Sequence, residues 1–265
     1  MSTPSIKSMR EAFDLTGKNA IVTGGNGGIG FGIAKSLAEC GADVAIFCRD
    51  MQKADHALKE LKPIGGKYEA FSCDITSMAG VREAAAAAYQ SFGNFEILVN
   101  NAGVTTNTML FDMDEEISDW HRVVNTDLTG IVNMTYVVGK RMRDAGKGGS
   151  IINITSNAGL MINRGMYLSP YSTAKAAACH FTRSMAIELK PYNIRVNAIA
   201  PGFIDDGFGK NMPQAMQYAI TAVQGVDRLG TVMEIGAMAV YLASPAAGFT
   251  TGAVNVVDGG YMLSC

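Results

Sequence analysis

The sequence NAIVTGGNGGIG, at residues 19–30, decides the fold of this chain. Its first five residues form an apolar run typical of a buried strand, and the spacing of Ile33, Leu37 and Ala38 after it indicates a helix. A strand, a glycine-rich turn and a helix in this order favour a phosphate-binding turn, because a helix N-terminus offers free N–H groups to an anion. The spacing G-x-x-x-G-x-G differs from the generic G-x-G-x-x-G. The turn therefore does not by itself identify a nucleotide-binding protein.

Outward from this stretch, strand and helix patterns alternate to the end of the chain. Further strands are expected at 43–47, 68–74, 97–99, 150–154, 195–200 and 253–257, and helices at 51–62, 77–92, 112–145, 171–190 and 234–243. The alternation predicts an α/β fold: a single-domain, doubly wound parallel sheet of about seven strands with helices on both faces, over 1–265. Residues 203–233 have weak periodicity, and we expect them to form a lid segment that covers a substrate.

Composition excludes several classes of protein. Lysine and arginine number 22 against 24 acidic residues, so the basic surface of a nucleic-acid-binding protein is missing. The five cysteines form no C-x-x-C pair and the three histidines are isolated, which predicts a reducing compartment and no metal site. Residues 1–18 are polar, and no run reaches the 18 apolar residues of a membrane helix. We expect a cytoplasmic protein without a membrane or nucleic-acid partner.

Polar residues follow several of the expected strands. Cys48 and Arg49 end the second strand, where a dinucleotide fold meets the adenosine ribose; a guanidinium there could pair with a 2′-phosphate, or be an ordinary solvated charge. Asp50 is expected to cap the next helix. Asn125 lies within a helical pattern, and asparagine in a helix interior suggests a kink or a polar role.

Tyr171 and Lys175 lie one helical turn apart, on the same face. An ammonium near a phenol stabilises the phenolate, which enables tyrosine to donate and accept protons near neutral pH. Ser156 follows the fifth strand, so its hydroxyl is expected at a strand end. Together these three groups could polarise and protonate a carbonyl. The alternative is a surface Tyr–Lys pair beside a capping serine.

Taken together, these motifs resemble the short-chain dehydrogenase/reductase family over nearly the whole chain. The matching elements are TGGNGGIG (23–30), CD (73–74), NNAG (100–103), Asn125, ITS (154–156), YSTAK (171–175) and PG (201–202). Each element is short, and the resemblance depends on their common order and spacing.

The resemblance implies Tyr171 as general acid/base, Lys175 as its activator and a ribose ligand, Ser156 as the residue that orients the substrate oxygen, and Asn125 as the anchor of a water. The residues implied at the cofactor are Gly24, Asn26, Gly28, Ile29, Gly30, Arg49, Cys73, Asp74, Ile75, Asn101, Ala102, Gly103, Tyr171, Lys175, Pro201, Gly202 and Ile204. The chain departs from the family in two ways. The gap from Ser156 to Tyr171 is two residues longer than usual. The position directly before Gly27 holds Asn26 and not a basic residue.

By this resemblance the protein is an NAD(P)(H)-dependent oxidoreductase that interconverts a secondary alcohol and a ketone, with NADP(H) favoured over NAD(H) because of Arg49. A homotetramer or homodimer is also implied. The alternative is a non-catalytic dinucleotide-binding sensor or scaffold with this fold. A methionine-rich pocket wall favours a hydroxysteroid or bile acid, whereas Asn107, Asn163, Arg164, Asp205 and Asp206 would suit a sugar or polyol. The expected wall consists of Leu160, Met161, Ile162, Met166, Leu168, Phe203, Phe208, Met212 and Met216.

Overall fold

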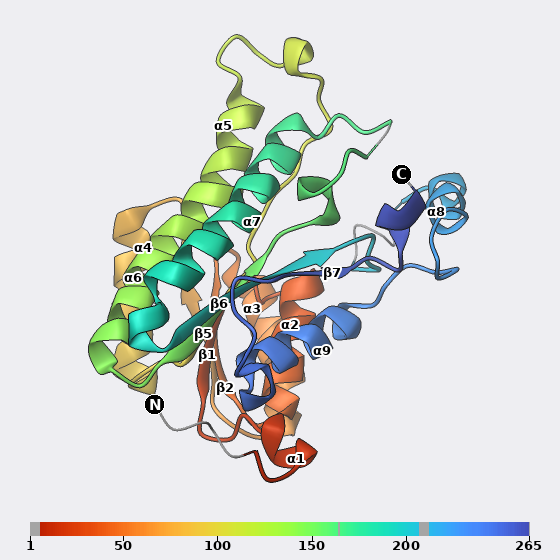
Figure 1. Cartoon of the computed structure of the whole chain (residues 1–265). Coiled ribbons are helices and arrows are strands. Elements are labelled where there is room, and N and C mark those ends of the chain that lie inside the picture. The colour runs from red at the N-terminus through yellow and green to blue at the C-terminus, as the bar shows by residue number, and fades with distance from the viewer. Residues whose placement is uncertain (1–5, 164, 207–211, 265) are drawn as a thin grey trace.

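A computed structural model describes residues 6–163, 165–206 and 212–264, and a seven-stranded parallel sheet forms its centre (Figure 1). The strand order is β3-β2-β1-β4-β5-β6-β7, and every neighbouring pair is parallel. The strands are β1 (Asn19–Thr23), β2 (Asp43–Cys48), β3 (Tyr68–Ser72), β4 (Ile97–Asn100), β5 (Gly149–Ile154), β6 (Ile194–Pro201) and β7 (Val254–Val257). The chain reverses its winding direction between β1 and β4, the place where open α/β sheets bind ligands at their carboxyl edge.

Helices cover both faces of the sheet, which confirms the predicted doubly wound fold (Figure 1). They are α1 (Met9–Ala12), α2 (Gly28–Glu39), α3 (Met51–Leu61), α4 (Met78–Phe92), α5 (Ser118–Val124), α6 (Gly130–Ala145), α7 (Ser169–Glu188), α8 (Gln214–Thr221) and α9 (Val232–Ala243). Helices α2, α3 and α9 contribute to one apolar core cluster, and α4 and α6 to the other.

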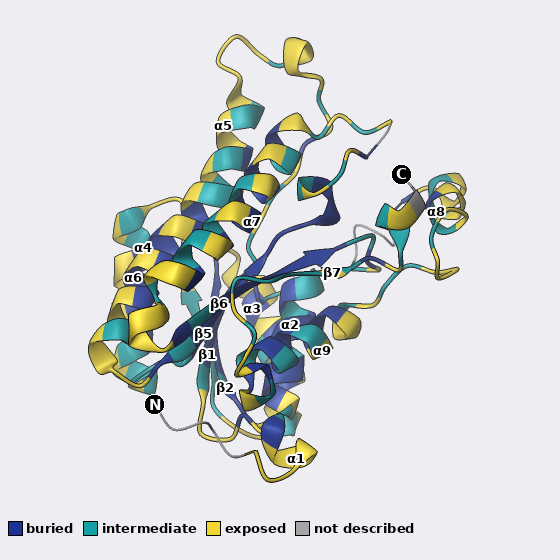
Figure 2. Cartoon of the chain, viewed as in Figure 1, coloured by how far each residue is buried: buried dark blue, intermediate teal, exposed yellow. Residues whose placement is uncertain are grey.

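The pleat of β1 explains why both faces need cover. Ala20 and Val22 belong to the α2 side of the core, whereas Ile21, between them, belongs to the α4 side. A strand buried on both faces is a continuous apolar run, as the sequence has it. The alanine run of α4 packs closely on the sheet, with Ala84, Ala85 and Ala88 buried. Figure 2 shows the central strands as the buried interior of the molecule, whereas the edge strands β3 and β7 are mostly of intermediate burial.

The helical pattern expected at 112–145 is interrupted. A π-helical segment, Asn125–Thr129, joins α5 to α6, and the N–H of Gly130 donates to the carbonyl of Asn125. Asn125, for which the sequence suggests a kink or a polar role, thus begins a π-bulge, which rotates the side chains around it relative to an α-helix. Asp50 caps α3 as expected, because its carboxylate accepts the Lys53 N–H at 3.0 Å.

In the expected lid segment, 203–233, the described residues 203–206 and 212–233 contain helix α8 and the first two residues of α9. The beginning and end of this segment meet, since Ile204 pairs with Gly230 in an isolated bridge. The centroid of the Phe203 ring also lies 5.1 Å from that of Tyr261, which follows β7. Within 6–163, 165–206 and 212–264, no helix is both long and apolar enough to cross a membrane.

Candidate active site

Lys175 lies at the carboxyl edge of the sheet with 3% of its surface exposed. Its Nζ donates to the carbonyl of Ile154, at the end of β5, at 3.1 Å, and lies 5.5 Å from the centroid of the Tyr171 ring. Asp127 Oδ2 is 3.0 Å from the same nitrogen. Burial opposes the ammonium charge, but the Asp127 carboxylate and then Tyr171 outweigh it and raise the pKa of Lys175. The site therefore holds a buried ammonium against one face of the tyrosine.

Ser156 lies two residues after the end of β5 and is buried. Its Oγ accepts the Ala158 N–H at 3.1 Å and caps a short 3-10 turn at Asn157–Gly159. This turn packs directly on α7, because a Cβ at Gly159 would come within 2.7 Å of the Ala176 nitrogen. The serine is thus fixed beside the helix that carries Tyr171 and Lys175. Residues 160–163 and 165–168, within the longer gap to Tyr171, form the loop beyond the turn.

The structure does not bring Asn125 to Lys175. Asn125 is exposed, whereas Asp127, two residues later, is fully buried. Two residues correspond to roughly half a helical turn, so their side chains leave the helix in nearly opposite directions. Sequence reasoning missed Asp127, although an acidic residue within an apolar helical pattern was a visible indication that it needs a buried partner.

A buried polar network lies beneath these groups. Asn101 Nδ2 donates to the Thr23 carbonyl at 3.0 Å, and Thr23 Oγ1 accepts the Asn101 N–H at 2.9 Å. Asn100 Nδ2 donates to Asn153 Oδ1 at 2.8 Å, and Asn153 Nδ2 to Thr182 Oγ1 at 2.9 Å. The side chain of Asn101 thus bonds to the backbone of β1, while that of Asn100 bonds to other side chains. We call Thr23, Asn100, Asp127, Asn153 and Lys175, with their partners, the floor of the site.

The glycine-rich turn is shaped for an anion. Gly27 caps α2 without a side-chain hydrogen bond, and a Cβ there would have nothing within 4 Å. Gly24 and Gly28 have positive φ angles of 64° and 52°. At Gly30 a Cβ would overlap the carbonyl of Gly24. Free N–H groups at a helix N-terminus with open space before them fit the pyrophosphate of a dinucleotide.

The first residues of the lid segment approach this turn. A Cβ built on Gly28 would lie 3.3 Å from the carbonyl oxygen of Asp206. Pro201 ends β6, and Ile204, which is buried, continues the chain toward the turn. Gly202 is equally close to its surroundings, since a Cβ there would lie 2.6 Å from that of Asp258. The predicted PG segment thus runs along the carboxyl edge of the sheet beside the turn.

Residues expected at the adenosine end lie after β2 and β3. Arg49 is exposed directly after β2, and its charge contributes to a lowered pKa of Asp74, behind the dominant hydrogen bonds from the backbone and side chain of Thr76. Asn26 Nδ2 donates to the Asp50 carbonyl at 3.1 Å. Burial, Asp74 and Cys48 raise the pKa of Cys73 to about 12, so this cysteine stays a neutral thiol.

The remaining predicted cofactor positions surround the turn and the floor. Ile29 and Ala102 are half-buried, Ile75 is buried, and Gly103 is exposed. A Cβ at Gly103 would lie 2.9 Å from Asp127 Oδ2 and 3.3 Å from Lys175 Nζ. Because glycine has no Cβ, Gly103 allows the NNAG loop to come closer to the ion pair than any other residue type would permit.

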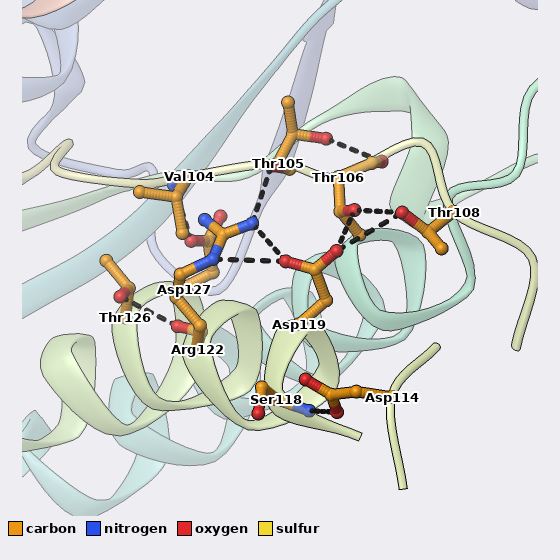
Figure 3. A network of polar contacts seen from close by, with 10 residues as sticks. All are labelled: Val104, Thr105, Thr106, Thr108, Asp114, Ser118, Asp119, Arg122, Thr126 and Asp127. Carbon is orange, nitrogen blue, oxygen red and sulfur yellow. Dashed lines mark hydrogen bonds and ion pairs between the residues drawn. The ribbon is translucent and has the colours of Figure 1, made fainter. Parts of the chain in front are cut away.

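Around the floor lie three segments, which we call the rim: 104–117, the described residues of 160–168, and the described residues of 203–233. Figure 3 shows how the first is tied to α5: Asp119 accepts hydrogen bonds from Thr106 Oγ1 at 2.7 Å and Thr108 Oγ1 at 3.2 Å, and pairs with Arg122 at 2.7 Å. The second is joined to it by the Tyr167 N–H, which donates to Asn107 at 2.8 Å.

Much of the rim is exposed and apolar. Of the expected pocket wall, Leu160 and Ile162 are exposed and Met212 is buried; Met161, Met166, Leu168, Phe203 and Met216 lie between. Phe208, like Arg164, lies outside the described residues. A separate hollow of about 340 Å³ lies between α4 and α6, lined by Arg82, Tyr136, Val137, Lys140, Arg141 and Asp144. Because it contains none of the floor residues, we place the site by its chemistry and not by the size of that hollow.

Comparison with known proteins agrees with this arrangement. A family model described as enoyl-(acyl carrier protein) reductase matches residues 24–262. The NADP-dependent mannitol dehydrogenase of Alternaria alternata is 33% identical over 99% of each chain. The 3-oxoacyl-[acyl-carrier-protein] reductase of Chlamydia muridarum is 37% identical over 93% of this chain and 98% of its own.

Solved structures superpose over almost the entire chain. A short-chain type dehydrogenase/reductase from Mycobacterium marinum has a TM-score of 0.91 and 35% identity, covering 96% of this chain and 99% of its own. A 7α-hydroxysteroid dehydrogenase, complexed with NADH and 7-oxo glycochenodeoxycholic acid, has a TM-score of 0.89 and 35% identity, covering 94% and 96%.

Proposed function

The chain belongs to the short-chain dehydrogenase/reductase family, and we propose that it is an NADP(H)-dependent oxidoreductase that interconverts a secondary alcohol and a ketone at Tyr171. The observation that carries the proposal is the buried Lys175 ammonium beside the Tyr171 ring, adjoining the Ser156 turn. A surface Tyr–Lys pair would leave the lysine in water. Here the lysine is buried beside the phenol, so water does little to screen its positive charge from the Tyr171 ring.

In the direction of reduction, Ser156 Oγ and the Tyr171 hydroxyl hold the carbonyl oxygen, where negative charge grows. Tyr171 then donates its proton to that oxygen, and Lys175 stabilises the phenolate that remains. A bound nicotinamide dinucleotide supplies or accepts the hydride at the substrate carbon. In the direction of oxidation, the phenolate takes the proton of the alcohol.

Three features support binding of the cofactor, and one favours NADP(H). The uncapped N-terminus of α2, the glycine turn and the free face of the carboxyl edge fit a dinucleotide. Arg49 is exposed after β2, where its guanidinium could pair with a 2′-phosphate, and Cys48 stands where an acid would favour a 2′-hydroxyl.

For the substrate we propose a ketone or alcohol with a bulky apolar body, such as a hydroxysteroid or bile acid. Apolar side chains of the rim, including Met109, Leu160 and Ile162, are exposed beside the site. Ile162 is 77% exposed, and a ligand that covers apolar surface of this kind is stabilised in its complex with the protein. We propose that 203–233 closes over that ligand as a lid.

A sugar or polyol is the second candidate, favoured by the similarity to mannitol dehydrogenase over the full length of the chain. The polar residues expected to serve it are partly engaged: Asn107 already accepts the Tyr167 N–H. A non-catalytic sensor or scaffold is the third. Such a protein has no need of a buried lysine beside a tyrosine, so we rank it last.

The homotetramer or homodimer and the cytoplasmic location stay predictions. Tyr136, exposed on α6, and Ile187, exposed on α7, lie on helices that the family resemblance implies at subunit contacts. Light scattering on the purified protein decides the first point.

The test is turnover of a panel of keto-steroids, keto-sugars and small ketones, followed at the absorbance of NADPH and of NADH. With the best substrate, Tyr171→Phe should lower kcat by about 10²–10⁴-fold, the usual contribution of a general acid. Binding of NADPH, measured by its fluorescence, should change little. Tyr192→Phe, at the far end of α7, is the matched control and should keep full activity. Normal turnover in Tyr171→Phe rules out the proposed mechanism.

A further inference from the structure

Asp127 lies in the π-helical segment between α5 and α6 and is completely buried. Its Oδ1 accepts the N–H of Val104 at 2.7 Å, and Figure 3 shows it beneath the first residues of the rim. Its Oδ2 faces Lys175 Nζ at 3.0 Å and finds no other hydrogen-bond donor among the described residues. One carboxylate therefore joins the NNAG loop to the catalytic helix.

The pair is enclosed on every side by fixed groups. Lys175 Nζ is held by α7, by the carbonyl of Ile154 at the end of β5 and by Asp127. Gly103 closes the remaining approach, since a Cβ there would touch both charged groups. A buried carboxylate without a partner would be strongly destabilising, so Asp127 depends on the Lys175 ammonium opposite it.

The titratable groups that face Lys175 come from two elements. Asp127 faces it from the π-helical segment, and Tyr171 and Cys179 face it from α7. Burial raises the pKa of the Cys179 thiol, against smaller opposing contributions from Thr155, Arg183 and Lys175, which keeps it neutral. The negative charge that the Lys175 ammonium meets is therefore that of Asp127.

We propose that Asp127 is a positioning residue for the proton transfer: it fixes the Lys175 ammonium between the Ile154 carbonyl and Tyr171 and sets the net charge that the phenol faces. The inference deepens the proposed function and rests on it, because it concerns the same tyrosine. With Asp127 in place the phenol meets a neutral pair. Without the carboxylate, the Lys175 ammonium keeps the Ile154 carbonyl as its acceptor, and its positive charge is uncompensated, which favours the phenolate more strongly.

Asp127→Asn separates this role from a merely structural one. The asparagine carbonyl still accepts the Val104 N–H, so the shape of the π-helical segment is retained while the charge is lost. In protein labelled with ¹³C at the tyrosine Cζ atoms, the Tyr171 resonance is identified by its absence in Tyr171→Phe. Its titration midpoint should fall by about one pH unit in Asp127→Asn, a tenfold change in the ionisation constant.

The control is Asp119→Asn, which removes a carboxylate eight residues earlier that pairs with Arg122 on the rim. It should leave the Tyr171 midpoint unchanged. The pH profile of alcohol oxidation should move to lower pH with the resonance, because the phenolate is the base in that direction. If Asp127→Asn does not fold, Asp127→Ser is measured under the same criterion.

An unchanged or higher midpoint overturns the positioning role, whatever the activity. The resonance is read without any substrate, so its outcome is independent of whether the right ketone has been found. Conversely, a lowered midpoint in a protein that turns over no substrate would uphold the role of Asp127 and refute the proposed function.

Discussion

The floor of the site and its rim both lie at the carboxyl edge of the sheet, yet their side chains have opposite environments. Asp127, Asn153 and Lys175 on the floor are 0–3% exposed and each is paired with a neighbour. On the rim, Phe111 is 94% and Ile162 77% exposed. Figure 2 shows the same contrast between the buried strands and the exposed loops beyond them.

This difference separates side chains that the fold itself holds in place from side chains that only a bound ligand would cover. On the floor, Asp127, Asn153 and Lys175 each have a partner within the chain, because an unpaired buried group would cost several kcal/mol. On the rim, apolar surface stays in water until something covers it. In the proposed function, the reaction depends on the floor and the choice of substrate on the rim. The predictions below test that division, beginning with the largest effect.

Gly30→Ala should produce the largest change, in the protein without any ligand. A Cβ at Gly30 would overlap the Gly24 carbonyl, coming within 2.8 Å of its carbon, and would also meet the Asn101 amide. Overpacking of this kind costs about 3 kcal/mol, which corresponds to a fall in Tm of roughly 6–12 °C for a chain of this size. Thermal unfolding of the apo protein measures it.

The matched control is Gly27→Ala, three residues earlier in the same turn. A Cβ there has nothing within 4 Å, and its φ of −180° suits any residue. Its Tm should match the wild-type value. Equal losses in the two variants would contradict the packing that we describe for the turn.

The floor also shows where sequence reasoning succeeds and where it ends. The strands, the glycine turn and the Tyr171–Lys175 spacing were predictable, because periodicity and turn chemistry are local properties of the sequence. Asp127 was not, because a π-bulge between two helices decides which side chain turns inward. The sequence placed a polar residue there, and only the packing of α6 and α7 shows that Asp127 rather than Asn125 meets the lysine.

The rim was harder to predict for a different reason. Thr106, Asp119 and Arg122 come together across a loop of irregular structure. No periodic pattern specifies the path of such a loop, since its contacts depend on the helix it returns to. Composition alone predicts residues of 160–168 as part of a pocket wall, but it says nothing of how these side chains are arranged.

Arg49→Ala tests an exposed side chain whose contribution only a ligand would reveal. Because Arg49 is exposed and directly follows β2, its loss should leave the Tm unchanged. The Kd for NADPH should rise about 10–100-fold, the worth of a hydrogen-bonded charge pair, while the Kd for NADH stays the same. Fluorescence titration of both cofactors measures this.

Lys53→Ala is the control for Arg49, since it removes a neighbouring exposed cation from the first turn of α3. It should leave both Kd values within about twofold of wild type, because a solvated charge contributes little. A similar loss in both variants would mean that general charge, and not a contact with the 2′-phosphate, attracts NADPH.

Ile162→Ser should have the smallest effect and distinguishes the two substrate classes. Its side chain is 77% exposed, so the Tm should not change. If an apolar ring system covers it, KM for that ketone should rise about tenfold with kcat unchanged, as expected for the loss of apolar contact made equally in ground and transition states. Ile187→Ser is the matched control, because Ile187 is 73% exposed near the opposite end of α7. A sugar or polyol would not depend on Ile162 in this way. An unchanged KM for every ketone in the panel would therefore remove the apolar substrate and leave the polyol as the better candidate.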